Sequence, residues 1–185
     1  MVKKEIRKLT LAATLTAFSI VLDILFKTIV PSNLSFGFPF YAIPLVIGSI
    51  VLGPIYGGVM GFLSDAIGFF AAPKGDYNFI FALQAISWGI VPFLIARRNS
   101  KIWRVSLAIL VTHIIASTLS TFADFMFQYL TLGKDYEQAL MIAGLNVPLR
   151  LMMMPVNIVI ISFITYQVNM RLEPLYVEFF HEARA

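Results

Sequence analysis

Six apolar runs of nearly membrane-spanning length are the feature that most limits how this chain can fold. A helix that crosses the hydrocarbon core of a bilayer needs roughly 20 mostly apolar residues. The runs cover residues 9–30, 38–52, 55–72, 79–96, 105–132 and 147–168. The sequence therefore predicts an all-α integral membrane protein with six transmembrane helices.

The composition supports a lipid environment. Charged residues make up 13% of the 185 residues, and hydrophobic residues make up 59%. A soluble domain carries roughly 25% charged residues, so these charges are too few to cover a water-exposed surface. The runs and their short connections use nearly the whole chain, which predicts one transmembrane domain over residues 1–185. The net charge of +4 lies at the ends of the runs, a pattern typical of membrane orientation rather than of nucleic-acid binding.

The basic residues are divided unequally between the two sides of the predicted bundle. With six spans, the N-terminus, residues 97–104 and the tail lie on one side. That side carries Lys3, Lys4, Arg7, Lys8, Arg97, Arg98, Lys101, Arg104 and Arg171. The other side carries Lys27, Lys74 and Lys134. Since basic residues accumulate on the cytoplasmic side, we expect both termini to be cytoplasmic.

Polar side chains inside the spans gather at one depth. Such groups are costly in hydrocarbon, so a functional site is the first hypothesis for them. Those near the outer ends of the spans are Asp23, Asp65, Gln84, Trp88, Asp124, Gln128, Asn146 and Arg150. His113 alone lies clearly toward the cytoplasm. A proton or ion path needs polar groups through both leaflets, so this distribution favours a substrate pocket on the extracellular side.

Several of these groups also admit a structural interpretation. Asp23 and Lys27 are four residues apart and can neutralise each other. Trp88 can be a packed aromatic residue of the core. Asp65 needs a partner, which is either Arg150 or a bound ligand. In the third span, Gly57, Gly61, Ser64 and Gly68 share one face, and small residues at this spacing allow close helix packing.

Motifs for catalysis, ATP hydrolysis and metal binding are missing from the sequence. It contains no G-x-x-x-x-G-K-[ST] loop, no H-E-x-x-H and no G-x-S-x-G. It has no cysteine and two histidines, His113 and His181, which together do not predict a metal site. We therefore expect no catalytic residues, no metal and no cofactor, and powered uptake by this chain would need another protein as motor.

A short six-span chain with Ala13 and Ala17 in an A-x-x-x-A pattern, and with a glycine-rich third span, resembles the S components of energy-coupling factor (ECF) transporters. In that family, the S component captures a vitamin from outside, and a separate transmembrane T component and two ATPases drive import. The resemblance implies a multi-pass protein of a bacterial cell membrane. It also implies that Ala13 and Ala17 contact the T component.

Within the family, the similarity is greatest to the folate-specific members. Three stretches carry it: residues 52–58 with Gly61 and Asp65, residues 73–79, and Arg150 followed by Met154-Pro155. The loop departs from the usual folate form, because Asn78 and Phe79 stand where a proline and a glycine follow the tyrosine. The resemblance implies that folate is the transported ligand. The expected substrate-binding residues are Tyr41, Asp65, Lys74, Tyr77, Asn78, Gln84, Trp88, Asp124 and Arg150.

The chemistry of these side chains suits folate. A pterin ring donates from its amino group and ring N–H, and its face stacks on aromatic rings. Asp65 or Asp124, together with Gln84, would read the ring edge. The candidates for stacking are Tyr41, Tyr77, Phe81 and Trp88. The anionic glutamyl tail would suit Lys27, Lys74 or Arg150.

Other functions stay open at this point. The chain can be an S component for another vitamin, such as pantothenate or riboflavin. If the chain is a small channel or a proton-coupled carrier, it should mediate uptake alone in liposomes. If it is an intramembrane enzyme, it should turn over a lipid or a quinone.

Overall fold

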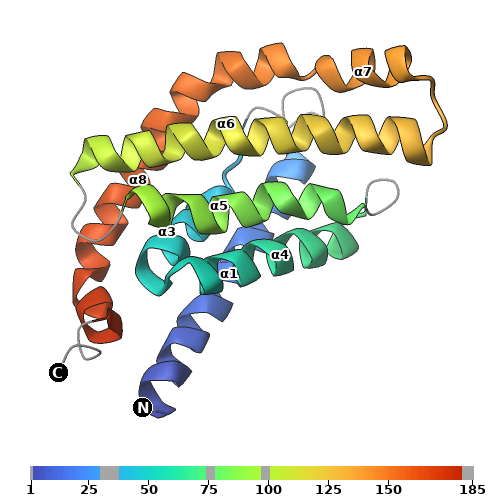
Figure 1. The fold of residues 1–185 in the computed structure, drawn as a ribbon. Helices are drawn as coiled ribbons and strands as arrows, with labels where there is room; N and C mark the ends of the chain where they lie inside the picture. The colour runs from blue at the N-terminus through green and yellow to red at the C-terminus, as the bar shows by residue number, and fades with distance from the viewer. Residues whose placement is uncertain (1, 30–37, 74–77, 97–100, 181–185) are drawn as a thin grey trace.

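The computed structural model describes residues 2–29, 38–73, 78–96 and 101–180, and these residues form helices and their connections, with no strand among them. The helices are α1 (Val2–Ile29), α3 (Ala42–Leu52), α4 (Pro54–Ala71), α5 (Ala82–Ile95), α6 (Ile102–Met126), α7 (Tyr136–Gly144) and α8 (Val147–Phe180). A 3₁₀ turn (Phe79–Phe81) precedes α5, and a π-helical turn (Phe127–Thr131), here called the π-turn, follows α6. Figure 1 shows their arrangement. The all-α prediction is confirmed.

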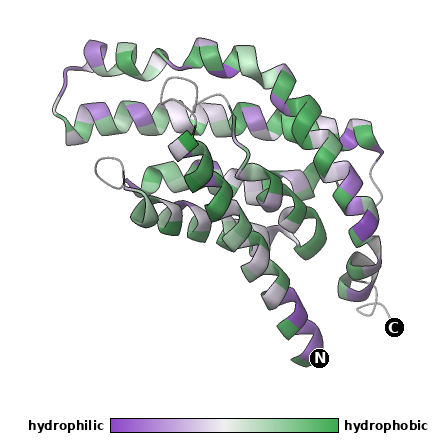
Figure 2. Cartoon of the chain, turned by 180° about the vertical axis from the view of Figure 1, so that it is seen from behind, coloured by the Kyte–Doolittle hydropathy of each residue, from purple (hydrophilic) through white to green (hydrophobic). Residues whose placement is uncertain are grey.

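The apolar helices correspond to the six predicted spans. Four segments are long and apolar enough to cross a membrane: Val2–Ile29, Pro54–Ala71, Ile102–Thr131 and Tyr136–Leu172. Two shorter apolar segments are Ala42–Leu52 and Phe79–Ile95. Apolar residues cover most of the ribbon, and hydrophilic residues concentrate at the start of α1 (Figure 2). Large apolar side chains point outward on these helices, including Phe18, Ile67 and Phe163, as contact with lipid requires.

Helix α3 forms the centre of the bundle rather than a lipid-facing span. All 11 of its residues are buried, and it contacts α1, α4, α5 and α8. At 1.5 Å per residue, a helix of this length measures about 16 Å, roughly half of the hydrocarbon thickness. Ser49 ties α3 to α5, because its hydroxyl accepts the Phe93 N–H at 3.1 Å. The second predicted span is therefore a short core helix.

Helices α4 and α5 approach closely because glycines line their contact. A Cβ added at Gly61 would lie 2.7 Å from the carbonyl carbon of Ala85 and 2.9 Å from the Cα of Ile86. A Cβ at Gly57 would overlap the carbonyl group of Gly89. These neighbours are backbone atoms that cannot rotate away. The prediction that the glycines serve helix packing is confirmed, and the close contact holds the start of α5 against α4.

The start of α1 and the end of α8 lie at the same end of the molecule (Figure 1). Arg7 of α1 forms an ion pair with Glu178 of α8, and the Tyr56 hydroxyl of α4 donates to Glu5 at 3.0 Å. An even number of crossings explains this placement of both helix ends on one side. That this side is the cytoplasmic one stays a prediction from the charges.

Candidate ligand-binding site

A cavity of about 660 Å³ lies where six helices meet, at the end of the bundle opposite to the start of α1. Its lining comes from the last turns of α1, α4 and α6, from α7 and from the first turns of α5 and α8. The stretch 38–41, directly before α3, completes it. Pockets for small molecules usually measure roughly 300–1,000 Å³. The cavity is therefore large enough for a vitamin-sized ligand.

Arg150 is the most firmly held polar group of the cavity wall. Its Nη2 donates to Asp124 Oδ2 at 3.1 Å, and its Nη1 donates to Thr121 Oγ1 at 2.9 Å and to the Ser117 carbonyl at 3.3 Å. The Arg150 side chain is 7% exposed and that of Asp124 is 23% exposed. Arg150 thus pairs with Asp124 of α6, a partner that the sequence did not suggest, since Arg150 was considered there as a partner of Asp65. The pair fixes the guanidinium plane in one orientation.

Asp23 and Lys27 form an ion pair on α1, so the interpretation that they neutralise each other holds. Both residues line the cavity. The Asp23 carboxylate reaches toward α4, where a Cβ at Gly68 would lie 3.1 Å from Asp23 Oδ2. The Lys27 side chain is 35% exposed, so its ammonium group stays accessible at this end of the bundle.

An aromatic group forms another part of the cavity wall. The rings of Phe26 and Phe40 stack with centroids 4.3 Å apart, and those of Phe38 and Phe40 with centroids 5.6 Å apart. Beside them, Gln84 Nε2 donates to the Tyr41 hydroxyl at 2.9 Å. These three phenylalanines were not among the predicted site residues, although positions 38, 40 and 41 are aromatic and begin the second predicted span.

The structure brings six of the predicted substrate-binding residues to the cavity. These are Tyr41, Asp65, Asn78, Gln84, Asp124 and Arg150, and the candidates Phe81 and Lys27 also line it. The Asn78 side chain accepts the Ile80 N–H at 3.0 Å and so starts the 3₁₀ turn. Lys74 and Tyr77 fall outside the described residues. The binding role of each residue stays a prediction.

Trp88 does not belong to the lining residues of the cavity. Its side chain is 1% exposed and meets the His113 ring edge to face, with centroids 5.7 Å apart. His113 Nε2 lies 3.1 Å from Asn157 Nδ2 of α8. Trp88 is therefore a packed aromatic residue of the core, as the structural interpretation of the sequence proposed.

The two predicted partner-contacting residues lie on the outer face of α1. Ala13 and Ala17 are exposed, whereas Thr16 and Ser19 are buried on the other face. The Ser19 hydroxyl donates to the Tyr41 carbonyl at 2.7 Å and lies 2.7 Å from Ser64 Oγ. The alanines thus lie on a different face of α1 from these buried polar residues.

Two sets of buried or cavity-lining polar residues were not among the predicted binding residues. Gln128 and Asn146 line the cavity, and both had been recognised only as polar residues at its depth. On α8, Ser162, Thr165 and Asn157 are buried, so the half of the bundle nearer the chain ends is less apolar than expected. Their spacing along one face of α8 was a signal that the sequence contained. Within the described part of the chain, no three His, Cys, Asp or Glu residues are placed to hold a metal ion.

Comparison with known proteins gives two matches. Residues 7–169 match the family model described as ECF transporter, substrate-specific component. The folate transporter FolT of Clostridium novyi (strain NT) is 33% identical over 111 residues, which cover 57% of this chain and 63% of that protein. The second match thus spans somewhat less than two thirds of its relative.

Proposed function

Because this chain belongs to the substrate-specific components of ECF transporters, a family of multi-pass membrane proteins, we propose that it captures folate from outside a bacterial cell for import. The observation that carries the proposal is the cavity, which combines stacked phenylalanine rings with converging amide, carboxylate and guanidinium groups. The similarity to a folate transporter supports the same ligand.

The aromatic group suits the flat part of folate. Phe38 and Phe40 line the cavity and stack on each other, and a pterin or benzoyl ring packs well against aromatic side chains. Asp65 and Gln84 line the same cavity and would accept hydrogen bonds from the amino group and the ring N–H. This division of labour, apolar walls with a few placed polar groups, is usual for small-molecule sites.

The anionic glutamyl tail needs a cation near the exposed side of the cavity. Both candidate cations already have a carboxylate partner, because Arg150 pairs with Asp124 and Lys27 pairs with Asp23. Lys27 is more exposed than Arg150 and lines the cavity on α1. We therefore assign the tail first to Lys27, with Arg150 closer to the middle of the ligand.

Import requires partners that supply energy. The sequence lacks an ATP-binding loop, so transport by this chain would use a T component and two ATPase subunits, as its family implies. The exposed alanines on α1 support this assembly, because a helix face of small side chains allows a partner helix to approach closely.

The direct test is ligand identification. The protein is purified in detergent, small molecules released from it are identified by mass spectrometry, and folate binding is measured by calorimetric titration. We expect a co-purified pterin compound and a dissociation constant below micromolar. If the protein binds pantothenate or riboflavin in place of folate, the family assignment stands and the ligand changes. Uptake by this chain alone in liposomes would instead indicate a stand-alone carrier.

A further inference from the structure

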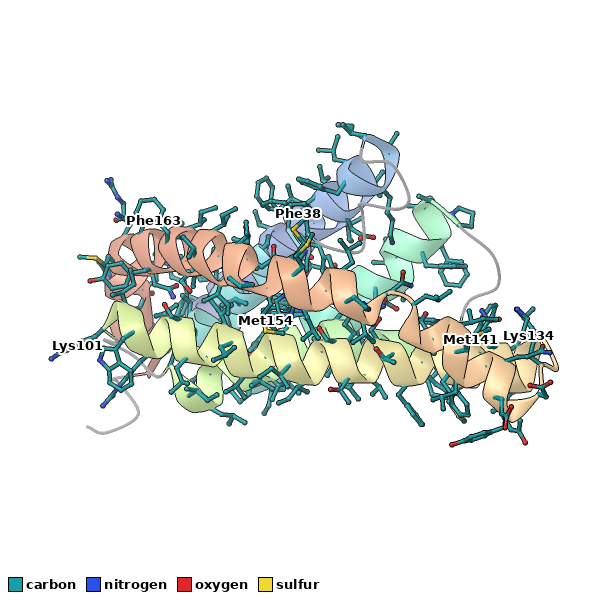
Figure 3. The ribbon with its side chains drawn as sticks, turned by 90° about the horizontal axis from the view of Figure 1, so that it is seen from above. Phe38, Lys101, Lys134, Met141, Met154 and Phe163 are labelled. Atoms are coloured by element: carbon teal, nitrogen blue, oxygen red, sulfur yellow. The ribbon has the colours of Figure 1, made fainter. Side chains whose placement is uncertain are left out.

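The end of α6 changes its helical geometry where it reaches the cavity. The π-turn closes with the Leu132 N–H donating to the Phe127 carbonyl at 3.1 Å, five residues back. Lys101 and Lys134 mark the two ends of α6 with its π-turn, and α8 lies alongside (Figure 3). Single π-turns within α-helices are rare and occur often at functional sites. Here the turn carries two cavity residues, Phe127 and Gln128.

Gln128 differs from the other polar groups of the cavity wall. Its Oε1 is buried and has no hydrogen-bond partner among the described residues. By contrast, Asp124 bonds Arg150, Gln84 bonds Tyr41, and Asn78 bonds the backbone. A buried amide oxygen without a partner is energetically unfavourable. A side chain that lines a cavity at this cost has hydrogen-bonding capacity available for a ligand.

We propose that Gln128 is a specificity-determining residue, held by the π-turn so that its side-chain amide pairs with the lactam edge of a bound bicyclic heterocycle. This assignment rests on the proposed function. A lactam presents an N–H donor beside a carbonyl acceptor. A carboxamide presents a carbonyl acceptor beside an NH₂ donor, so the two groups match through two hydrogen bonds.

Gln128 offers an acceptor and a donor side by side in one group. Asp65 offers only acceptors when ionised, and the amide of Gln84 is engaged with Tyr41. Gln128 on the α6 side of the cavity therefore matches both the ring N–H and the ring carbonyl. With the amide in the orientation that leaves its buried oxygen for the ring N–H, a ring in which an amino group replaces the carbonyl would place two donors against each other.

The test compares two ligands on the full chain in detergent: folate and a folate analogue with a 2,4-diamino ring, which lacks the lactam carbonyl. Wild type is expected to prefer folate. Gln128→Leu removes both hydrogen bonds and should weaken folate binding by roughly tenfold or more, with a smaller effect on the analogue. Gln128→Glu replaces the NH₂ donor by an acceptor and should shift the preference toward the diamino ring. Gln138→Leu, at an exposed position of α7 away from the cavity, is the matched control and should change neither affinity.

The ratio of the two affinities decides the outcome, since a merely structural role would weaken both ligands alike. An unchanged ratio in both variants, or an equal loss for both ligands, overturns the assignment. Gln128→Asn, which keeps the amide but shortens its reach, serves if the leucine variant does not purify as a single species. A wild-type protein that binds no folate refutes the proposed function itself, whereas wild-type binding with unaffected variants removes only the role of Gln128.

Discussion

Asp124 and Arg150 form a buried pair that single substitutions can probe. Asp124→Asn removes the counter-charge of Arg150 and leaves its hydrogen bonds to Thr121 and Ser117. Removing one partner of a buried ion pair lowers the free energy of unfolding by about 3–5 kcal/mol. Because Asp124 is partly exposed, we expect a loss near the lower end of this range. We expect a clearly lower Tm of the purified protein in a thermal unfolding assay. Glu137→Gln at an exposed site of α7 is the control, and a Tm of the Asp124 variant equal to the control would contradict a stabilising pair.

The same pair shows which properties of single residues can be predicted from the sequence. The depth of Asp124 and Arg150 along their helices follows from counting residues within each apolar run. Their pairing does not, because it depends on how α6 and α8 are rotated against each other, and Asp65 lies at a comparable depth. For Gln128 the sequence likewise indicates the depth but not the local geometry, since nothing in it predicts a π-turn after Met126.

At the scale of helices, the close contact between α4 and α5 can be tested by replacing glycine with alanine. The same replacement at a glycine outside the contact is expected to change stability in the opposite direction. Alanine normally stabilises a helix relative to glycine by up to about 1 kcal/mol. Gly61→Ala should instead destabilise by about 1–3 kcal/mol through overpacking, because the new Cβ meets the backbone of Ala85 and Ile86. Gly144→Ala has nothing within 4 Å of its new Cβ and should be neutral or stabilising. Thermal unfolding of both variants measures the difference, and equal effects would rule out the close contact.

Helix α8 supports a second prediction at this scale. The buried hydroxyls of Ser162 and Thr165 have no hydrogen-bond partner within the residues that the structure describes. Ser162→Ala and Thr165→Val remove these hydroxyls at nearly constant shape, so the Tm should stay the same or rise. Asn157→Leu should lower it, because Asn157 bonds His113. A lower Tm for the first two variants would show that their hydroxyls have partners in the membrane-embedded protein.

The six apolar helices could be located from the sequence, whereas α7 falls between two predicted spans and was not. The environment of the helices could not be predicted either. Lipid requires long apolar helices, so hydropathy found all six. Helix α3 is apolar on every side, and this pattern is compatible both with lipid contact and with burial in protein. Its short length was the usable signal. Its central position follows from packing against α1, α4, α5 and α8, which a one-dimensional pattern does not contain.

On the scale of the whole molecule, the two ends of the bundle differ in structure. One end holds the cavity, and the other holds the start of α1 and the end of α8, joined by Arg7 and Glu178. The sequence predicted this polarity from the depth of ionisable residues. The buried polar residues of α8 reduce it, because they extend hydrogen-bonding groups from His113 toward the chain ends. The cavity and the exposed alanine face of α1 nevertheless lie on separate surfaces, so the proposed capture and the proposed partner contact can be tested separately.

That separation predicts that transport and binding can be uncoupled. Ala13→Trp and Ala17→Trp, made together, place bulky rings on the exposed face of α1 and should block close approach of the T component. Because the substituted face is exposed, whereas Thr16 and Ser19 are buried on another face and Ser19 bonds the Tyr41 carbonyl, we expect folate affinity within about threefold of wild type, a difference well below the 1.4 kcal/mol of a tenfold change. ATP-driven uptake in liposomes with the partner subunits should fall to background. Val159→Trp, at an exposed apolar site of α8, controls for ring insertion into lipid and should retain uptake. If the double variant loses folate binding together with uptake, these alanines belong to the fold or the cavity and not to a partner surface.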